Sequence, residues 1–222
     1  MSNSPLAALL RWAGLCGVLA AAVYVLTVVL GGLLSPGYSH VGQAISELVA
    51  TGAPNRAVLD FLFAVYGILL LLFGQGLVVA GSLHRSRSLV ASGAMVIVCT
   101  AAGLAMSPLP MDPRGAPATL AGSLHLVMAG ITSLATILAL FFGAAGFGRV
   151  APLAALKPVT RVLGFVVVGT GLLAAAAPAL APSVMGVFER LTIGAFMAWL
   201  VLAGSTLARN AAALVPAHPE PA

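Results

Sequence analysis

The sequence predicts an all-α fold, a polytopic six-helix transmembrane bundle, and three features of the chain lead to this class. Hydrophobic residues make up 61% of the 222 residues and charged residues only 7%, whereas charged residues are about a quarter of a soluble domain. The few charges separate six apolar runs, each with roughly the 18 or more residues that a spanning helix needs. The runs are continuous, whereas barrel strands alternate apolar and polar residues, so helices are favoured.

The predicted spans lie at about residues 10–34, 57–82, 89–108, 118–146, 161–181 and 189–208. The first apolar run continues to Leu34, which is too long for a signal-peptide core of about 7 to 15 residues, so we expect an uncleaved first helix. The fourth span follows a linker with three prolines between Pro108 and Pro113, which excludes a continuous helix there. Residues 1–215 therefore form a single membrane domain, and the tail 216–222 is expected to be disordered.

The longest linker between spans follows the first helix and carries an amphipathic pattern. Its apolar residues recur at the spacing of one helical face, namely Val41, Ala44, Ile45, Leu48 and Val49. This pattern predicts a short helix that lies at the membrane interface or in the mouth of the bundle.

The distribution of basic residues predicts the orientation of the bundle. With an even number of spans both termini share one side, and seven of the ten basic residues fall there: Arg11, Arg85, Arg87, Arg149, Lys157, Arg161 and Arg209. Cytoplasmic loops of membrane proteins carry such an excess. We therefore expect a multi-pass protein of the cell inner membrane with both termini in the cytoplasm. The positive-inside rule accounts for the net charge of +5. We therefore expect membrane lipids as partners and no nucleic acid, and a homo-oligomer is a further possibility.

The opposite face gathers most of the acids together with histidines and arginines. We expect these groups to meet in a single hydrated recess, which would form any functional site. The candidate acid–base groups are Glu47, Asp112 and His125, because carboxylates and imidazole can be tuned toward neutral pH. The candidate substrate-binding residues are His40, Ser46, Asn55, Arg56, Arg114, Glu189 and Arg190.

Structural roles compete with these functional ones. Glu189 at a helix start favours the helix dipole, and a buried His125 could be satisfied by one hydrogen bond. Arg190 cannot face its neighbour Glu189, so we expect it to pair with Glu47 or Asp112. No histidine or acid pair has the i, i+4 spacing of a metal site, and Cys16 and Cys99 lie inside spans; no metal or other cofactor is expected.

Several motifs carry a resemblance to a known family. The segments 38–40, 45–48 and 50–56 (Tyr-Ser-His, Ile-Ser-Glu-Leu and Ala-Thr-Gly-Ala-Pro-Asn-Arg) resemble the six-span prokaryotic membrane proteins of the domain of unknown function 998 family. The match continues at residues 110–113, 122–125 and 188–190. The resemblance implies a six-helix fold with its polar signature in the outer half, and it implies no reaction.

Three functions remain open at this point. The first is binding or modification of an amphiphilic substrate, a lipid or an isoprenoid, in a polar pocket open to the outer leaflet. The second is proton-coupled transport of a small molecule. The third is a non-catalytic membrane scaffold in which the charges only latch the bundle mouth. Whether the protein is an enzyme is left open by the sequence.

Overall fold

A computed structural model describes residues 4–216, which form six long helices and three short 3₁₀ helices. In chain order these are α1 (Pro5–Leu34), η1 (Ile45–Val49), α2 (Arg56–Leu83), α3 (Arg87–Ala105), α4 (Leu120–Phe147), η2 (Ala151–Leu153), α5 (Leu156–Leu180), η3 (Pro182–Val184) and α6 (Met185–Arg209). All six long helices are long and apolar enough to cross a membrane, which confirms the predicted fold class. Apart from Pro216, the tail predicted to be disordered lies outside the described residues.

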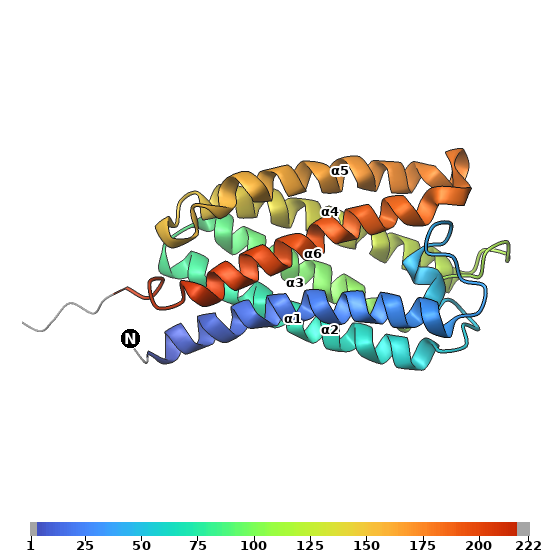
Figure 1. Cartoon of the computed structure of the whole chain (residues 1–222), viewed down its shortest axis with the longest axis horizontal. Coiled ribbons are helices and arrows are strands. Elements are labelled where there is room, and N and C mark those ends of the chain that lie inside the picture. Colours follow the sequence, from blue (N-terminus) through green and yellow to red (C-terminus); the bar gives the residue numbers. More distant parts are fainter. Residues whose placement is uncertain (1–3, 217–222) are drawn as a thin grey trace, which may run out of the picture.

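The six helices form a closed ring in which each packs against its neighbours in sequence and α6 closes on α1 (Figure 1). Both ends of the described chain lie at one end of this bundle, at the left of Figure 1, with the α2–α3 and α4–α5 connections. We call this the terminal end. The opposite end, which we call the loop end, holds the α1–α2 loop (residues 35–55) with η1, and the linker of residues 106–119.

The main hydrophobic core fills the centre of the ring around Trp199 of α6, which is completely buried. Its ring centroid lies 5.7 Å from those of Phe73 and Phe196 and 6.5 Å from that of Phe147. A large indole at this place joins α2, α4 and α6, because a ring of six helices leaves an axis that small side chains cannot fill.

A smaller core lies beneath η1 and attaches the α1–α2 loop to the bundle. It consists of Val28, Ile45, Leu48 and Leu59. The short helix η1 confirms the helix predicted after the first span. It is a 3₁₀ helix, and Val41, which was expected on its apolar face, precedes it and is half exposed.

Glycines let α1 and α6 approach each other closely near the terminal end. A Cβ added to Gly14 would lie 2.5 Å from the carbonyl oxygen of Gly204 and 2.6 Å from the backbone nitrogen of Ala208. These distances leave no room for a side chain, so the helix pair depends on the missing Cβ atoms, as in other membrane bundles.

We expect Gly14→Ala to destabilise the bundle by about 1–3 kcal/mol, because the methyl group overpacks the contact between α1 and α6. Gly169→Ala is the matched control, since a Cβ there meets nothing within 4 Å and helix propensity favours alanine. Thermal unfolding of the two purified variants in detergent measures the difference. Equal stability of both variants would contradict the close approach.

Candidate functional site

The α1–α2 loop is fastened to α6 by Arg190, which binds the loop at several points. Its Nη1 donates to the carbonyl oxygens of Gln43, at 2.9 Å, and Gly186, at 3.0 Å. Its Nη2 donates to the hydroxyl of Tyr38, at 2.6 Å, and contacts His40 Nδ1 at 3.1 Å. One guanidinium thus joins backbone and side chains of the loop to the first turns of the last helix.

The neighbouring Glu189 holds the same loop through a different bond. Its Oε2 accepts a hydrogen bond of 2.8 Å from the backbone nitrogen of Ile45. One turn earlier, Gly186 is buried, and a Cβ there would contact Arg190 Nη1 and the carbonyl oxygens of His40 and Gln43. The absent side chain therefore lets the loop backbone lie directly on α6.

Glu47 forms the second fastening, this time to the linker of residues 106–119. Its Oε1 accepts bonds from Arg114 Nη2, at 2.7 Å, and from the backbone nitrogen of Ala44, at 2.9 Å, while Oε2 accepts from Gln43 Nε2 at 2.8 Å. The carboxylate is buried, with 7% of the side chain exposed, whereas Arg114 is half exposed. Burial alone would raise the pKa of Glu47, but the hydrogen bonds from Gln43, Arg114 and Ala44 together hold it below its ordinary value.

The contact with Arg190 fixes the protonation of His40. A guanidinium only donates hydrogen bonds, so Nδ1 of His40 must accept and the imidazole must be neutral. Burial, and then the positive charge of Arg190, lower the pKa of His40 in agreement with this state. The hydroxyl of Tyr38 completes the chain of bonds, because it accepts from Arg190 and donates to the carbonyl oxygen of Ala44 at 2.8 Å. Burial is the main cause that raises the pKa of Tyr38.

An open hollow of about 330 Å³ lies between the loop and the linker. Tyr38, Gln43, Glu47 and Arg114 supply its polar wall, and prolines and small residues of the loop supply the rest. The exposed guanidinium of Arg114 is thus accessible from this hollow, whereas the carboxylate of Glu47 is already occupied by its three donors.

Asp112 and His125 do not join this network. Asp112 accepts bonds from the backbone nitrogen of Thr119, at 2.9 Å, and from its hydroxyl, at 2.7 Å, at the start of α4. The bonds to the backbone and then to the hydroxyl of Thr119 lower the pKa of this exposed carboxyl. His125 is buried, and its Nδ1 lies 2.8 Å from the carbonyl oxygen of Leu109. Both residues therefore attach the linker to α4.

The remaining sequence candidates at the loop end bind separate partners outside this network. Arg56 pairs with Asp60 at 3.2 Å within the first turns of α2, and its Nη2 donates to the carbonyl oxygen of Ser107. The other two bind nearby atoms: Asn55 Nδ2 donates to the carbonyl oxygen of Leu34, at 2.6 Å, and Ser46 Oγ contacts the sulfur of Met111, at 3.0 Å.

Two expectations about this end are corrected by the geometry. Arg190 pairs with neither Glu47 nor Asp112, because it lies under the loop against backbone carbonyls while Glu47 faces Arg114. The ionisable groups also do not share a single recess. One set surrounds the loop. Asp112 of the linker instead binds Thr119, and His125 of α4 contacts the linker carbonyl of Leu109.

The structure adds a feature that the sequence patterns did not indicate, a loosely packed half of the bundle. On α4 no residue between His125 and Ala135 is buried, and on α5 none between Val167 and Ala177. The same holds on α6 between Gly186 and Ala195. We call residues 126–134, 168–176 and 187–194 the loose stretch.

The loose stretch includes positions on the inner faces of the helices. On α4 the inner face continues from Thr136 through Thr132 and Ala129 to His125, at helical spacing. Thr132 and Ala129 are nevertheless only half buried, whereas the corresponding positions in the terminal half are buried. In Figure 1 the ribbons of α4 and α5 separate toward the loop end. Helical periodicity in the sequence does not reveal this difference in burial along the same face.

Among residues 4–216 there is no group of three or more His, Cys, Asp or Glu side chains that could hold a metal ion. The described cysteines are free, and buried Cys99 contacts the hydroxyl of Thr136 at 3.5 Å.

Comparison with known families matches residues 18–206 to the model described as "Protein of unknown function (DUF998)". The chain belongs to this family. The match covers the segment from the first helix to the last and confirms the resemblance drawn from the loop and linker motifs. No curated protein and no solved structure matches the chain.

Glu47 should make the stability of this family member depend on pH. Folding lowers the pKa of Glu47 below its ordinary value of 4.5, so its carboxylate stabilises the fold above pH 4.5 and this contribution is lost as the pH falls through the folded-state pKa. We expect Glu47→Gln to cost about 1–3 kcal/mol at neutral pH and to weaken the loss of stability on acidification.

Chemical unfolding in detergent, at neutral pH and below pH 4.5, measures both effects. Asp60→Asn removes a more exposed acid at the same end and should cost only about 0.3–0.5 kcal/mol. A Glu47→Gln variant as stable as Asp60→Asn at neutral pH would contradict the role given to the carboxylate.

Proposed function

We propose that this membrane protein binds an amphiphile, with the hydrocarbon part in the loose stretch between α4, α5 and α6 and the polar headgroup beneath the α1–α2 loop. The observation that carries the proposal is the loss of buried residues from three helices at the same end. Membrane helices associate through close packing. The inner faces of the loose stretch are only half buried, so we infer that an apolar chain has room there.

Polar groups lie in and beside the loose stretch, where they would contact the headgroup of the ligand. Glu189 and Arg190 lie within the loose stretch of α6, and the Nε atom of Arg190 is buried without a hydrogen-bond partner among the described residues. An unsatisfied donor is costly where water is scarce, and an oxygen of a headgroup would satisfy it. Thr192 also donates to Thr170 at 2.8 Å between α6 and α5, which adds hydroxyls to an otherwise apolar surface.

Binding is better supported than catalysis. An acid–base mechanism needs its groups within hydrogen-bond reach of one substrate, whereas Glu47, Asp112 and His125 have separate partners on the loop, at the start of α4 and on the linker. Support for a proton-coupled carrier is weaker still, since Thr100 is buried with its hydroxyl bonded to Val96 and Gln75 is exposed on the outer surface of α2.

The proposal includes an orientation. Seven basic residues of the described chain lie at the terminal end and three at the loop end, which favours a cytoplasmic terminal end in the inner membrane by the positive-inside rule. The loose stretch would then open toward the outer leaflet, and its ligand would be a lipid or isoprenoid of that leaflet.

A non-catalytic scaffold is the second candidate, and a specific observation favours it. Glu47, Asp112, His125 and Arg190 each bind neighbouring atoms of the chain itself, as expected of contacts that only hold the loop and linker in place.

Ala129→Trp tests the amphiphile proposal, because an indole on the inner face of α4 would fill the loose stretch. We expect this variant to lose the lipid that co-purifies with the wild-type protein, measured by mass spectrometry of extracted lipids after purification in mild detergent. Val127→Trp is the matched control, since Val127 is 53% exposed on the outer face of the same helix.

Retention of the same lipid by Ala129→Trp, with both variants folded, would overturn the proposed site. Absence of any stoichiometric lipid from the wild-type protein would instead favour the scaffold.

A further inference from the structure

In the part of the chain that the structure describes, every charged side chain at the terminal end is basic. Its seven cationic side chains are all exposed, and none has an acidic partner among residues 4–216: Arg11, Arg85, Arg87, Arg149, Lys157, Arg161 and Arg209. The ion pairs of the described chain are both at the loop end. Among residues 4–216, this end therefore carries a positive potential that no acidic side chain neutralises.

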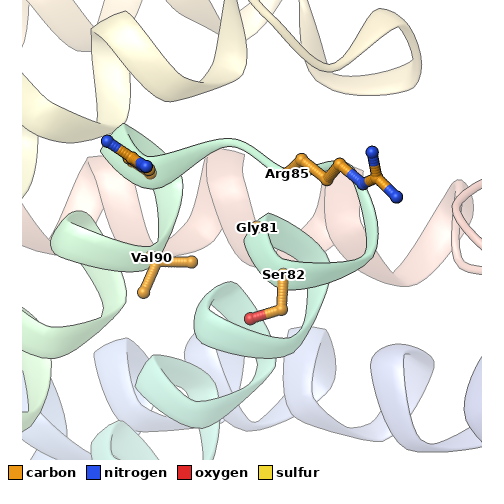
Figure 2. Close-up of a pocket in the computed structure, with 5 residues that line it drawn as sticks. Gly81, Ser82, Arg85 and Val90 are labelled. Carbon is orange, nitrogen blue, oxygen red and sulfur yellow. The ribbon is translucent and has the colours of Figure 1, made fainter.

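A hollow of about 300 Å³ lies at this end, where α2 turns into α3. Gly81 and Ser82 of α2 and Val90 of α3 line it, together with Arg85 of the connection and Arg87, the first residue of α3. Figure 2 shows the extended side chain of Arg85 directed away from the two helices, and Arg87 also lines the hollow. Arg85 has a φ of 50°, in the left-handed region, which helps the chain reverse direction between the helices.

Membrane orientation explains the sign of these charges, but it requires no hollow between two of them. We propose that this hollow binds the phosphate of an acidic phospholipid through the guanidinium groups of Arg85 and Arg87, with the side chain of Arg85 turning toward the hollow when the lipid binds. The site lies at the opposite end of the bundle from the proposed amphiphile site, and it stands or fails independently of it.

The chemistry of the hollow fits a lipid phosphate. Arginine presents planar donors that match phosphate oxygens, often two at a time, and basic pockets at the ends of membrane helices attract anionic headgroups. The wall supplied by Gly81 and Val90 is apolar, and both residues belong to helices apolar enough to span the membrane, along which the acyl chains would lie. A freely diffusing phosphate would gain nothing from that apolar wall.

The experiment measures lipid selectivity of the full-length protein in nanodiscs that contain equal amounts of phosphatidylglycerol and phosphatidylcholine. We expect the wild-type protein to retain phosphatidylglycerol in excess when extracted lipids are quantified by mass spectrometry. Arg85→Gln with Arg87→Gln should lower this excess at least about tenfold, because each guanidinium near a lipid phosphate contributes about a factor of five. Arg85→Lys with Arg87→Lys should keep most of it.

The matched control is Arg11→Gln with Arg161→Gln, which removes the same charge from the same end without touching the hollow. It should leave selectivity within about twofold of wild type, as screened surface charges act weakly. Val90→Trp fills the hollow at unchanged charge and should also abolish the excess, which keeps the test valid if the glutamine variant does not fold.

Three results would overturn the proposal. They are equal losses in the hollow and control variants, full retention by Val90→Trp, and displacement of the lipid by inorganic phosphate alone. The first would indicate a diffuse surface field, the second another place of binding, and the third a site for free phosphate.

Discussion

The two adjacent side chains Glu189 and Arg190 fasten the α1–α2 loop to the last helix, and the loop end depends on this contact. A loop at the mouth of a membrane bundle has backbone groups with little water to bind, so each needs a partner from the protein. Glu189 binds a backbone N–H, and Arg190 binds backbone carbonyls together with Tyr38 and His40. Because the residues are neighbours on a helix, they project to different parts of the loop, and one helical turn organises it from η1 back to Tyr38.

The two halves of the bundle are held together by different kinds of contact. In the terminal half, Trp199 packs against aromatic side chains of neighbouring helices, and glycines let α1 and α6 pack closely. In the loop half, polar contacts of the loop and linker hold the helix ends, and the inner faces of α4, α5 and α6 stay accessible. The loop and linker thus cover the mouth of the bundle over a stretch of three helices without buried residues, and this arrangement underlies the proposed amphiphile site. At the opposite end, the cations have no acidic partner within residues 4–216, and this observation underlies the proposed phosphate site.

Charges and apolar runs predicted much of this structure. Runs of uncharged residues located the six helices, because a helix in a bilayer excludes charged side chains. The apolar spacing around Ile45 and Leu48 located η1. The sequence also placed Glu47, Arg114, Glu189 and Arg190 at one end. The pairing among them was wrong for Arg190, since spacing along the chain does not reveal which face of a helix a loop crosses. His125 shows the same limit, because its partner is a linker carbonyl that any residue type could supply.

The sequence by itself determined the class of fold, the number of spans and the division of charges between the two ends. Each follows from the cost of placing polar groups in hydrocarbon, which acts on every residue independently of its neighbours in space. Only the tertiary structure decided which acid meets which arginine, where the bundle is loosely packed and where Arg85 and Arg87 flank a hollow. Those features depend on the distances between helices, which are set by many small side chains acting together and leave no periodic signal in the chain.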